Sequence, residues 1–233
     1  MIGIGVLAYY GLPDVQRCLP SIQQHTVNDY HLLLFDNSED TEIREWVSRQ
    51  MPEVEYVRSP YNVGCTVSRN RMAARFAQLG VRHFVVLDED VEVVATAWDA
   101  EMLAIFGKYP DTGIVGWELA NRSMGPRHAR DETGVVPELP GMCNMYSMGC
   151  VRSVGGWCEE YFFYRWDTDF CLTAATKGYL TRVVNPDGGH DGVAHNHPHR
   201  GTARNQRAGQ IKRRSQAIFD RRKKELGFAG VGF

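Results

Sequence analysis

Three acidic residues, Asp88, Glu89 and Asp90, follow a short apolar run and form a cluster of potential metal ligands. The run, residues 84–87, is too short for a helix and suits a strand buried on both faces. Ligands of open α/β sheets bind beyond the carboxyl ends of the strands, where these acids would lie. Carboxylates two positions apart repel each other unless a cation compensates, and oxygen ligands suit Mg²⁺ or Mn²⁺ carrying a phosphate. The alternative is an acidic loop that only solubilises the strand end.

A second apolar run, residues 31–35, leads directly into Asp36, so another expected strand also ends in an acid. Strand and helix periodicities alternate from residue 2 to residue 117, which is typical of a doubly wound, mostly parallel α/β sheet flanked by helices. Right-handed crossovers in such a sheet bring Asp36 and the acids at 88–90 to the same edge. The expected strands cover residues 2–7, 31–35, 54–57, 84–87 and 113–117, and the expected helices cover 14–22, 41–50, 66–79 and 98–109.

The second half of the chain is less regular. Residues 120–142 are rich in Gly, Pro and polar side chains and are expected to form loops. A strand at 142–150, a helix that begins at Asp167 and ends at Gly178, and a strand at 179–184 follow. We therefore expect one α/β domain over residues 1–199, with a first half at 1–117 and a second at 118–199, and a basic helical tail at 200–233.

Charge is distributed unevenly along the 233 residues. Residues 200–233 carry ten Lys and Arg against two acids, a net charge of +8 within a total of −2, which leaves −10 on residues 1–199. A basic tail on an acidic body suggests an anionic partner, such as a membrane surface or the acidic face of a second copy. The other possibility is a solvated amphipathic helix that packs Ile211 and Ile218 on the body. No motif or aromatic interleaving points to nucleic acid.

The six cysteines show no C-x-x-C pair, which indicates reduced and packed thiols. No stretch is long and apolar enough to span a membrane, and the first ten residues lack the basic start and cleavage site of a secretory signal. These features predict a cytoplasmic protein, which the basic tail could make peripheral to a membrane.

Several short motifs, taken in order, resemble the family 2 glycosyltransferases, which are inverting enzymes of the GT-A fold. No single motif is specific, but their order and spacing extend over residues 2–199. The motifs are Val6-Leu-Ala-Tyr-Tyr with Arg17-Cys-Leu-Pro-Ser-Ile22, Phe35-Asp-Asn-Ser38, Asn62-Val-Gly64 with Arg69-Asn70, Leu87-Asp-Glu-Asp90, and Gly155-Gly-Trp-Cys-Glu-Glu160 leading to Trp166-Asp-Thr-Asp-Phe-Cys-Leu172 and Gly178.

The resemblance implies roles for residues on the nucleotide side. Asp36 matches the aspartate that accepts hydrogen bonds from the nucleotide base, although it could also be a turn or helix-capping residue. Asn62 and Arg69 match the loop that flanks the nucleotide, where Arg69 either meets the diphosphate or is an ordinary solvated arginine. Asp88 and Asp90 match the D-x-D motif that binds the metal and the ribose or diphosphate, with Asp90 as the expected direct ligand.

The resemblance also implies a general base. Asp167 matches the aspartate that deprotonates the acceptor hydroxyl, and a single base is what an inverting displacement requires. Asp169 is the fallback for this role, and helix capping by Asp167 is compatible with catalysis. The sequence departs from the family at Trp166, where Glu is common, and at Thr173, where Arg is often found, which puts acceptor binding in doubt.

Histidines near the end of the α/β domain match a region where the family often has a further metal ligand. His195, His197 and His199 alternate, so they share one face of an extended segment. We expect His195, and next His197, to bind the metal; imidazole suits Mn²⁺ better than Mg²⁺. A merely polar loop is the alternative for any one of them.

Together these features predict an inverting glycosyltransferase that depends on Mn²⁺ or Mg²⁺. The donor would be a nucleoside-diphosphate sugar, with UDP as the expected nucleotide, and the acceptor a hydroxyl of a glycan, lipid, peptide or small molecule. Two alternatives remain at this point: a nucleotidyltransferase of similar architecture, and a non-catalytic module that binds a nucleotide sugar or carbohydrate. A nucleotidyltransferase would usually carry a glycine-rich basic loop after the first strand, which residues 9–13 lack.

Overall fold

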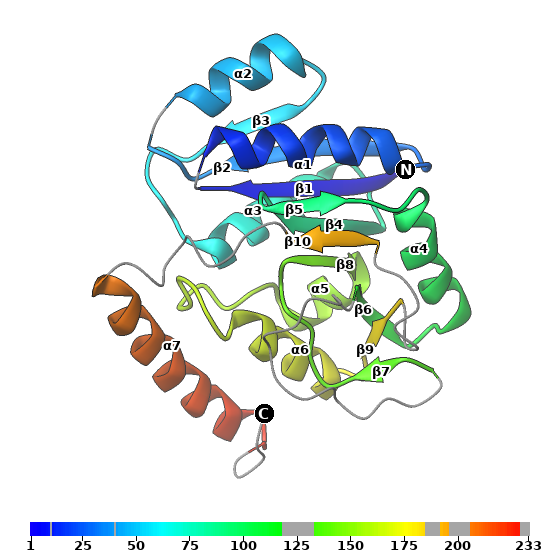
Figure 1. Cartoon of the computed structure of the whole chain (residues 1–233). Helices are drawn as coiled ribbons and strands as arrows, with labels where there is room; N and C mark the ends of the chain where they lie inside the picture. Colours follow the sequence, from blue (N-terminus) through cyan, green and yellow to red (C-terminus); the bar gives the residue numbers. More distant parts are fainter. Residues whose placement is uncertain (10, 40, 118–132, 185–191, 196–205, 229–233) are drawn as a thin grey trace.

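The computed structural model describes residues 1–9, 11–39, 41–117, 133–184, 192–195 and 206–228, apart from the side chains of residues 195 and 206–208. Its centre is a sheet of eight strands in the order β3-β2-β1-β4-β8-β6-β9-β7, flanked by helices on both faces (Figure 1). The strands of this sheet are β1 (Ile2–Ala8), β2 (Tyr30–Asp36), β3 (Glu55–Arg58), β4 (His83–Asp88), β6 (Thr112–Gly116), β7 (Val135–Val136), β8 (Cys143–Ser147) and β9 (Leu180–Val183).

The first half of the sheet is parallel, as the alternation of strands and helices predicts. Strands β3, β2, β1 and β4 are all parallel neighbours, whereas β8 enters antiparallel between β4 and β6. The expected strand at 142–150 is divided, because the hydroxyl of Ser147 accepts a hydrogen bond from the main-chain N of Cys150 and caps a helix there. The sheet is therefore mixed: four strands are parallel on the side of β1, and β6 and β9 form a further parallel pair beyond β8.

The helices form two layers with separate cores. One face of the sheet packs against α1 (Leu12–His25), α2 (Glu42–Gln50) and α4 (Trp98–Lys108). The other face packs against α3 (Cys65–Gln78), α5 (Met148–Val154), α6 (Trp166–Thr176) and α7 (Gln206–Glu225). A separate pair of antiparallel strands, β5 (Val91–Val93) and β10 (Val193–His195), lies beside the end of β4.

The two glycines of β1 are explained by the close approach of α3 rather than by a nucleotide-binding turn. A Cβ at Gly3 would lie 2.6 Å from a ring carbon of Phe76, and a Cβ at Gly5 would lie 2.7 Å from the sulfur of Met72. Because α3 sits this close to β1, its first turn is held at the carboxyl edge of the sheet.

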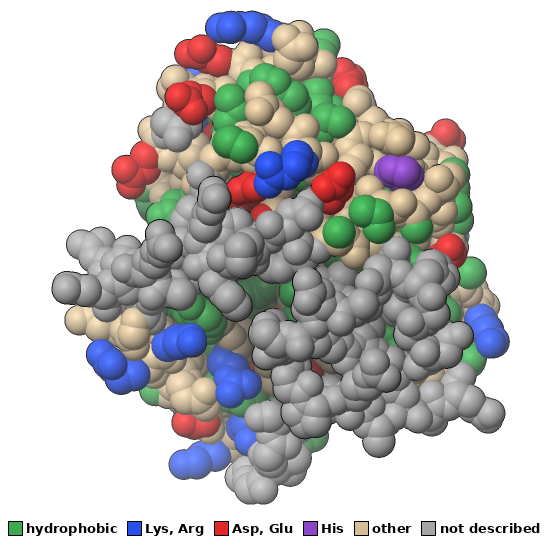
Figure 2. Space-filling model, viewed as in Figure 1, with side chains coloured by type: hydrophobic (Ala, Val, Ile, Leu, Met, Phe, Trp, Pro, Cys, Tyr) green, Lys and Arg blue, Asp and Glu red, His purple; other side chains and the backbone are tan. Residues whose placement is uncertain are grey.

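The basic tail is part of the packed structure where it is described. Ile218 and Phe219 of α7 are buried in the same core as α3, α5 and α6, as expected for Ile218. The exposed side of α7 is basic. Lys and Arg side chains gather at the lower left of Figure 2, where α7 lies in Figure 1. All six cysteines are free thiols, in agreement with the sequence. Within the described residues no helix is long and apolar enough to cross a membrane.

Candidate active site

The acids expected at one edge of the sheet do lie together. Asp36 is the last residue of β2 and Asp88 the last of β4, and both strands pair with β1, where Ala8 is opposite Asp36 and Leu7 is opposite Asp88. Asp36 and Asp88 therefore both end strands at the edge formed by the carboxyl ends of β2, β1 and β4, as the sequence predicts.

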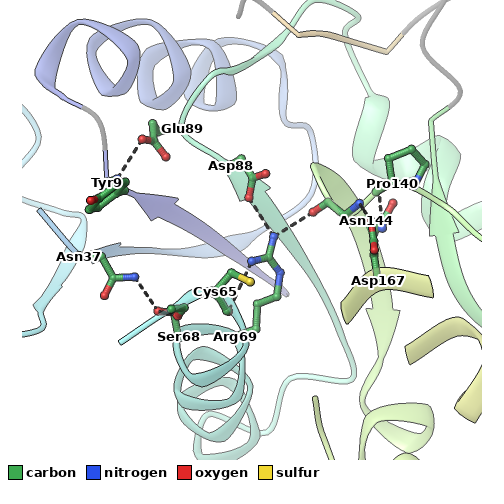
Figure 3. A network of polar contacts seen from close by, with 12 residues as sticks. Tyr9, Asn37, Cys65, Ser68, Arg69, Asp88, Glu89, Pro140, Asn144 and Asp167 are labelled. Carbon is green, nitrogen blue, oxygen red and sulfur yellow. Dashed lines mark hydrogen bonds and ion pairs between the residues drawn. The ribbon is translucent and has the colours of Figure 1, made fainter. Parts of the chain in front are cut away.

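The middle acid of the 88–90 cluster is directed differently from the other two. The Glu89 side chain is buried, and its Oε1 accepts a hydrogen bond of 2.9 Å from the main-chain N of Tyr9 at the end of β1 (Figure 3). Asp88 and Asp90 are both partly exposed. The spacing of i and i+2 thus leaves two carboxylates at the edge, while Glu89 fastens the turn to β1.

Arg69 is not a solvated residue, as one reading of the sequence had it. Its side chain is 1% exposed, and its Nη2 donates hydrogen bonds of 2.9 Å to Oδ1 of Asp88 and 2.9 Å to the carbonyl of Gly141. Burial lowers the pKa of the Arg69 guanidinium, but the negative charge of Asp88 opposes this and the pKa lies above its ordinary value. Arg69 therefore holds one acid of the D-x-D pair from inside the protein.

Trp166 forms one wall of this arginine site. The guanidinium carbon of Arg69 lies 3.9 Å from the ring centroid of Trp166, which is a stacked cation–π contact. The ring also fills the space beside Gly141, where a Cβ would lie 1.9 Å from a carbon of the indole. The departure from the family at Trp166 is thus accounted for by packing, because this buried side chain faces Arg69.

Asp167 is joined to the same network through Gly141. Its Oδ2 accepts a hydrogen bond of 3.2 Å from the main-chain N of Gly141, and its Oδ1 accepts one of 2.9 Å from the N of Thr168. The carbonyl of Gly141 in turn accepts a hydrogen bond from Arg69, so the main chain of this one residue connects the expected base with the arginine that holds Asp88. These contacts connect three residues predicted from the sequence, Arg69, Asp88 and Asp167.

The surroundings of Asp167 favour its neutral form more than water does. Burial raises the pKa of the Asp167 carboxyl, the hydrogen bond from Thr168 lowers it, and the charge of Glu138 raises it, with a raised pKa as the result. A raised pKa brings a carboxylate closer to the basicity that proton abstraction needs.

Asp169 is located away from this network. Its side chain is buried, and its Oδ1 lies 2.6 Å from Nε of Arg222 in α7 and 3.3 Å from the hydroxyl of Tyr161. The same guanidinium lies beside Thr173, at 3.5 Å from its hydroxyl. An aspartate that is buried and paired in this way is poorly placed to reach an acceptor, so the geometry does not favour it as the fallback base.

Asp36 is completely buried beneath the edge. Its Oδ2 accepts a hydrogen bond of 2.5 Å from the hydroxyl of Tyr56, and its Oδ1 accepts one of 2.7 Å from the N of Ser38. With an exposed fraction of 0%, the carboxylate is not open to a nucleotide base in this structure. It orders Tyr56 and the turn at Ser38 instead.

Asn62 and Asn37 order the loop before α3. The side-chain oxygen of Asn62 accepts a hydrogen bond of 2.9 Å from the N of Gly64. Asn37 accepts one of 3.3 Å from the N of Val63 and donates one of 2.9 Å to the hydroxyl of Ser68. These bonds connect the end of β2 with the first turn of α3, which carries Arg69.

The main chain brings one expected histidine close to the D-x-D acids. Strand β10 pairs with β5 so that His195 is opposite Val91, the residue after Asp90. His197 and His199 lie outside the described residues, and no group of three or more His, Cys, Asp or Glu side chains forms a metal site within the described part of the chain. Carboxylate and imidazole are both ligand types that suit Mn²⁺.

Two residues of this site, Gly141 and Tyr9, were not among the site residues predicted from the sequence. Gly141 lies in a segment rich in Gly and Pro, and its contact with Trp166 depends on the folded chain. Tyr9, at the carboxyl end of β1, is an aromatic residue that is 39% exposed at the same edge as the acids. Its position directly after an apolar strand is the one clue that could have indicated it.

Comparison with known proteins identifies the family of this chain. Residues 4–154 match the family model described as glycosyl transferase family 2, so the chain belongs to that family. The fold and family define the class of protein as a GT-A glycosyltransferase. No curated protein matches the sequence significantly.

The similar solved structures are distant in sequence and share the fold. One is the mannosyltransferase PcManGT from Pyrobaculum calidifontis, solved with GDP-Man and Mn²⁺. It is 16% identical with a TM-score of 0.67, and the match covers 97% of this chain and 67% of the PcManGT chain. GalNAc-T7, solved with UDP, GalNAc and Mn²⁺, is 13% identical with a TM-score of 0.68 and coverages of 97% and 54%. TarS from S. aureus is 14% identical with a TM-score of 0.62 and coverages of 78% and 34%. This chain thus spans from about a third to two thirds of these proteins.

Proposed function

We propose that this chain transfers a sugar from a nucleoside-diphosphate sugar to a hydroxyl acceptor, with inversion at the anomeric carbon. The observation that carries the proposal is the connection Asp88–Arg69–Gly141–Asp167, because it joins a donor-side carboxylate and a candidate base in one hydrogen-bonded network. A transferase that works in one displacement needs these two functions at a fixed separation.

The donor would bind at the edge formed by β2, β1 and β4. The related folds were solved with GDP-Man, UDP or UDP-GlcNAc, which supports a nucleotide sugar as the donor, and we keep UDP as the expected nucleotide. The exposed ring of Tyr9 offers a face on which a base can stack. Asp36, Asn62 and Asn37 would shape this side by holding Tyr56 and the loop before α3 rather than by direct contact from Asp36.

A divalent cation would be held mainly by Asp90, with Asp88 and a histidine, His195 or His197, as further ligands. Asp88 is already bound to Arg69 through Oδ1, so Asp90 is the stronger candidate for direct ligation. When bound, Mn²⁺ or Mg²⁺ offsets negative charge on the diphosphate that leaves. The positive charge of Arg69 beside Asp88 limits the total negative charge at this edge.

Asp167 would accept the proton of the acceptor hydroxyl. The residue as a whole is partly exposed, two main-chain N–H groups bind its carboxylate, and burial raises its pKa. The hydroxyl oxygen then attacks the anomeric carbon from the side opposite the nucleotide, with no covalent intermediate on the protein. Asp169 is not proposed for this role because Arg222 occupies it.

Ligand-dependent thermal stability tests the donor part of the proposal. UDP, GDP, dTDP and CMP are added to the full chain with and without Mn²⁺. A ligand that binds only the folded state stabilises it, and the stabilisation increases with the ratio of ligand concentration to Kd. We expect one nucleoside diphosphate to raise Tm, and to do so more strongly with Mn²⁺. If none of the four changes Tm under either condition, the proposed donor site is wrong and a module without a nucleotide ligand is favoured.

A further inference from the structure

We propose that α7 acts as a strap that holds residues 158–165, here called the 158–165 loop, and thereby positions Asp167. Arg222 and Gln216 of α7 would then be positioning residues for the transfer reaction, so this inference rests on the proposed function. Under this proposal the basic tail contributes to catalysis by positioning Asp167, a role that neither its charge nor its helical pattern indicates.

The 158–165 loop ends in an unusual backbone conformation. Tyr164 and Arg165 have φ values of 60° and 63°, in the left-handed region that residues with a side chain rarely adopt. Arg165 directly precedes α6, and its carbonyl accepts the hydrogen bond of 2.9 Å from the N of Asp169 that closes the first turn. Asp167 lies inside this turn, so the two strained residues set the direction in which its carboxylate points.

One side of the loop is fixed to α3. The carbonyl of Phe162 accepts a hydrogen bond of 3.1 Å from the N of Cys65, and the carbonyl of Tyr161 accepts one of 2.6 Å from the hydroxyl of Thr66. A Cβ at Gly64 would lie 2.9 Å from the ring of Phe162, so the two segments are in close contact. These contacts fasten the loop before its strained end.

The strained end itself is held by α7. Nε of Arg165 donates a hydrogen bond of 3.1 Å to the side-chain oxygen of Gln216, and the Arg165 guanidinium lies 5.2 Å from the ring centroid of Phe219. The hydroxyl of Ser215 donates to the carbonyl of Phe163. The segment that turns into α6 is thus enclosed by one face of α7.

A second connection joins α7 to the turn after Asp167. Nε of Arg222 lies 2.6 Å from Oδ1 of Asp169; the aspartate is buried at 3% exposed, whereas the arginine side chain is 23% exposed. Such an ion pair resists separation, because loss of Arg222 leaves the buried charge of Asp169 without compensation. The described contacts from α7 therefore reach residues on both sides of Asp167 in the sequence.

This arrangement predicts a specific kinetic effect. The strap contacts the loop and α6, whereas Asp88 is held by Arg69 of α3. Loss of the strap should misplace Asp167 and lower kcat, while the affinity for the donor nucleotide stays near that of the parent. A helix that only adds stability would not separate the two quantities.

Two substitutions of Arg165 test whether α7 holds the strained backbone. Arg165→Ala keeps the strain and removes the contacts with Gln216 and Phe219, whereas Arg165→Gly removes the same contacts and relieves the strain. We expect Arg165→Ala to lower kcat about tenfold with donor affinity within about twofold of the parent, and Arg165→Gly to recover most of the loss. Equal kcat values for the two variants would overturn the proposal.

Hydrogen exchange of the full chain tests the strap without reference to activity. Two variants remove the ion pair: Arg222→Ala, and a double variant with Asp169→Asn and Arg222→Gln that leaves no unpaired charge. In both, the amides of residues 158–169 should exchange about tenfold faster than in the parent. Lys224→Ala, an exposed position of the same helix, should leave them unchanged. Parental exchange in both Arg222 variants would reject the strap. If the Arg222 variants exchange faster than the parent but the parent itself transfers no sugar, the proposed function is rejected and the strap is retained.

Discussion

Nη2 of Arg69 lies 2.9 Å from Oδ1 of Asp88, and the same nitrogen lies 2.9 Å from the carbonyl oxygen of Gly141. One buried cation thus joins the end of β4 to the segment whose main-chain N–H binds Asp167. Because the guanidinium is also stacked on Trp166, it has little freedom to move between these partners. Asp88 and the segment that binds Asp167 are thus connected through a single side chain of α3.

Removal of the Arg69 charge should therefore destabilise the protein. Arg69→Met leaves Asp88 without its buried partner, and because Asp88 is itself 34% exposed we expect a loss of about 2–4 kcal/mol in the free energy of unfolding. Urea denaturation of the variant and parent gives this difference. Arg71→Ala, an exposed arginine of the same helix, should change it by less than about 0.5 kcal/mol. Similar losses for both variants would show that the ion pair contributes nothing specific.

A methyl group at Gly141 should disturb the connection from its other end. A Cβ there would lie 1.9 Å from the buried indole of Trp166, so Gly141→Ala should cost about 1–3 kcal/mol by overpacking and should also lower transfer. Gly107→Ala in α4 is the matched control, because no atom lies within 4 Å of its Cβ and alanine favours a helix. Thermal unfolding should show a lower Tm for the first variant and an equal or higher Tm for the second. A parental Tm and rate for Gly141→Ala would contradict this packing.

Replacement of Asp90 tests the metal site. Asp90→Asn keeps the size of the side chain and removes the charge that would hold the cation, so transfer should fall by about a hundredfold or more. The position is at the edge of the sheet, and the fold should remain intact by circular dichroism. Titration of activity with Mn²⁺ should show that the variant binds the cation more weakly than the parent does. If the variant keeps full activity and the parental Mn²⁺ dependence, the direct ligand lies elsewhere.

The pH dependence of turnover should reflect the raised pKa of Asp167. The base acts only as a carboxylate, so kcat should rise as pH increases through its pKa, and burial places this rise above the ordinary range of an aspartate. The same shift has an opposite sign for stability, because a folded state that binds the proton more tightly than the unfolded state loses stability as pH increases through this window. A pH series of kcat at saturating donor measures the rise. A midpoint in or below the ordinary aspartate range would exclude the proposed environment.

Much of the fold follows from local sequence patterns. Apolar runs that end in Asp36 and Asp88 indicated both the strands and their common edge, because parallel strands with right-handed crossovers leave few alternatives. The antiparallel insertion of β8 was not predicted. The end of β8 was not predicted either, since the apolar residues of 142–150 continue through the point where Ser147 starts a helix. Capping by one hydroxyl decided that boundary.

The candidate site was predictable in its residue types and not in its contacts. Asp88, Asp90 and Asp167 were indicated by motif and position, but the pairing of Arg69 with Asp88 joins residues 19 positions apart on different elements. The burial of Asp36 depends on Tyr56 from a neighbouring strand, and the ion pair of Asp169 depends on Arg222 in the tail. Such contacts arise from tertiary packing, which local patterns do not encode.

The most direct test of the account is the comparison of turnover and donor binding for Asp167→Asn. The substitution removes the proposed base and leaves Asp88, Asp90 and Arg69 in place, so the variant should bind nucleotide and Mn²⁺ with parental affinity. Its kcat should fall by about two to four orders of magnitude, which is the usual effect of a positioned base. A variant that transfers sugar at the parental rate would contradict the assignment of Asp167 and, with it, the proposed single-displacement mechanism.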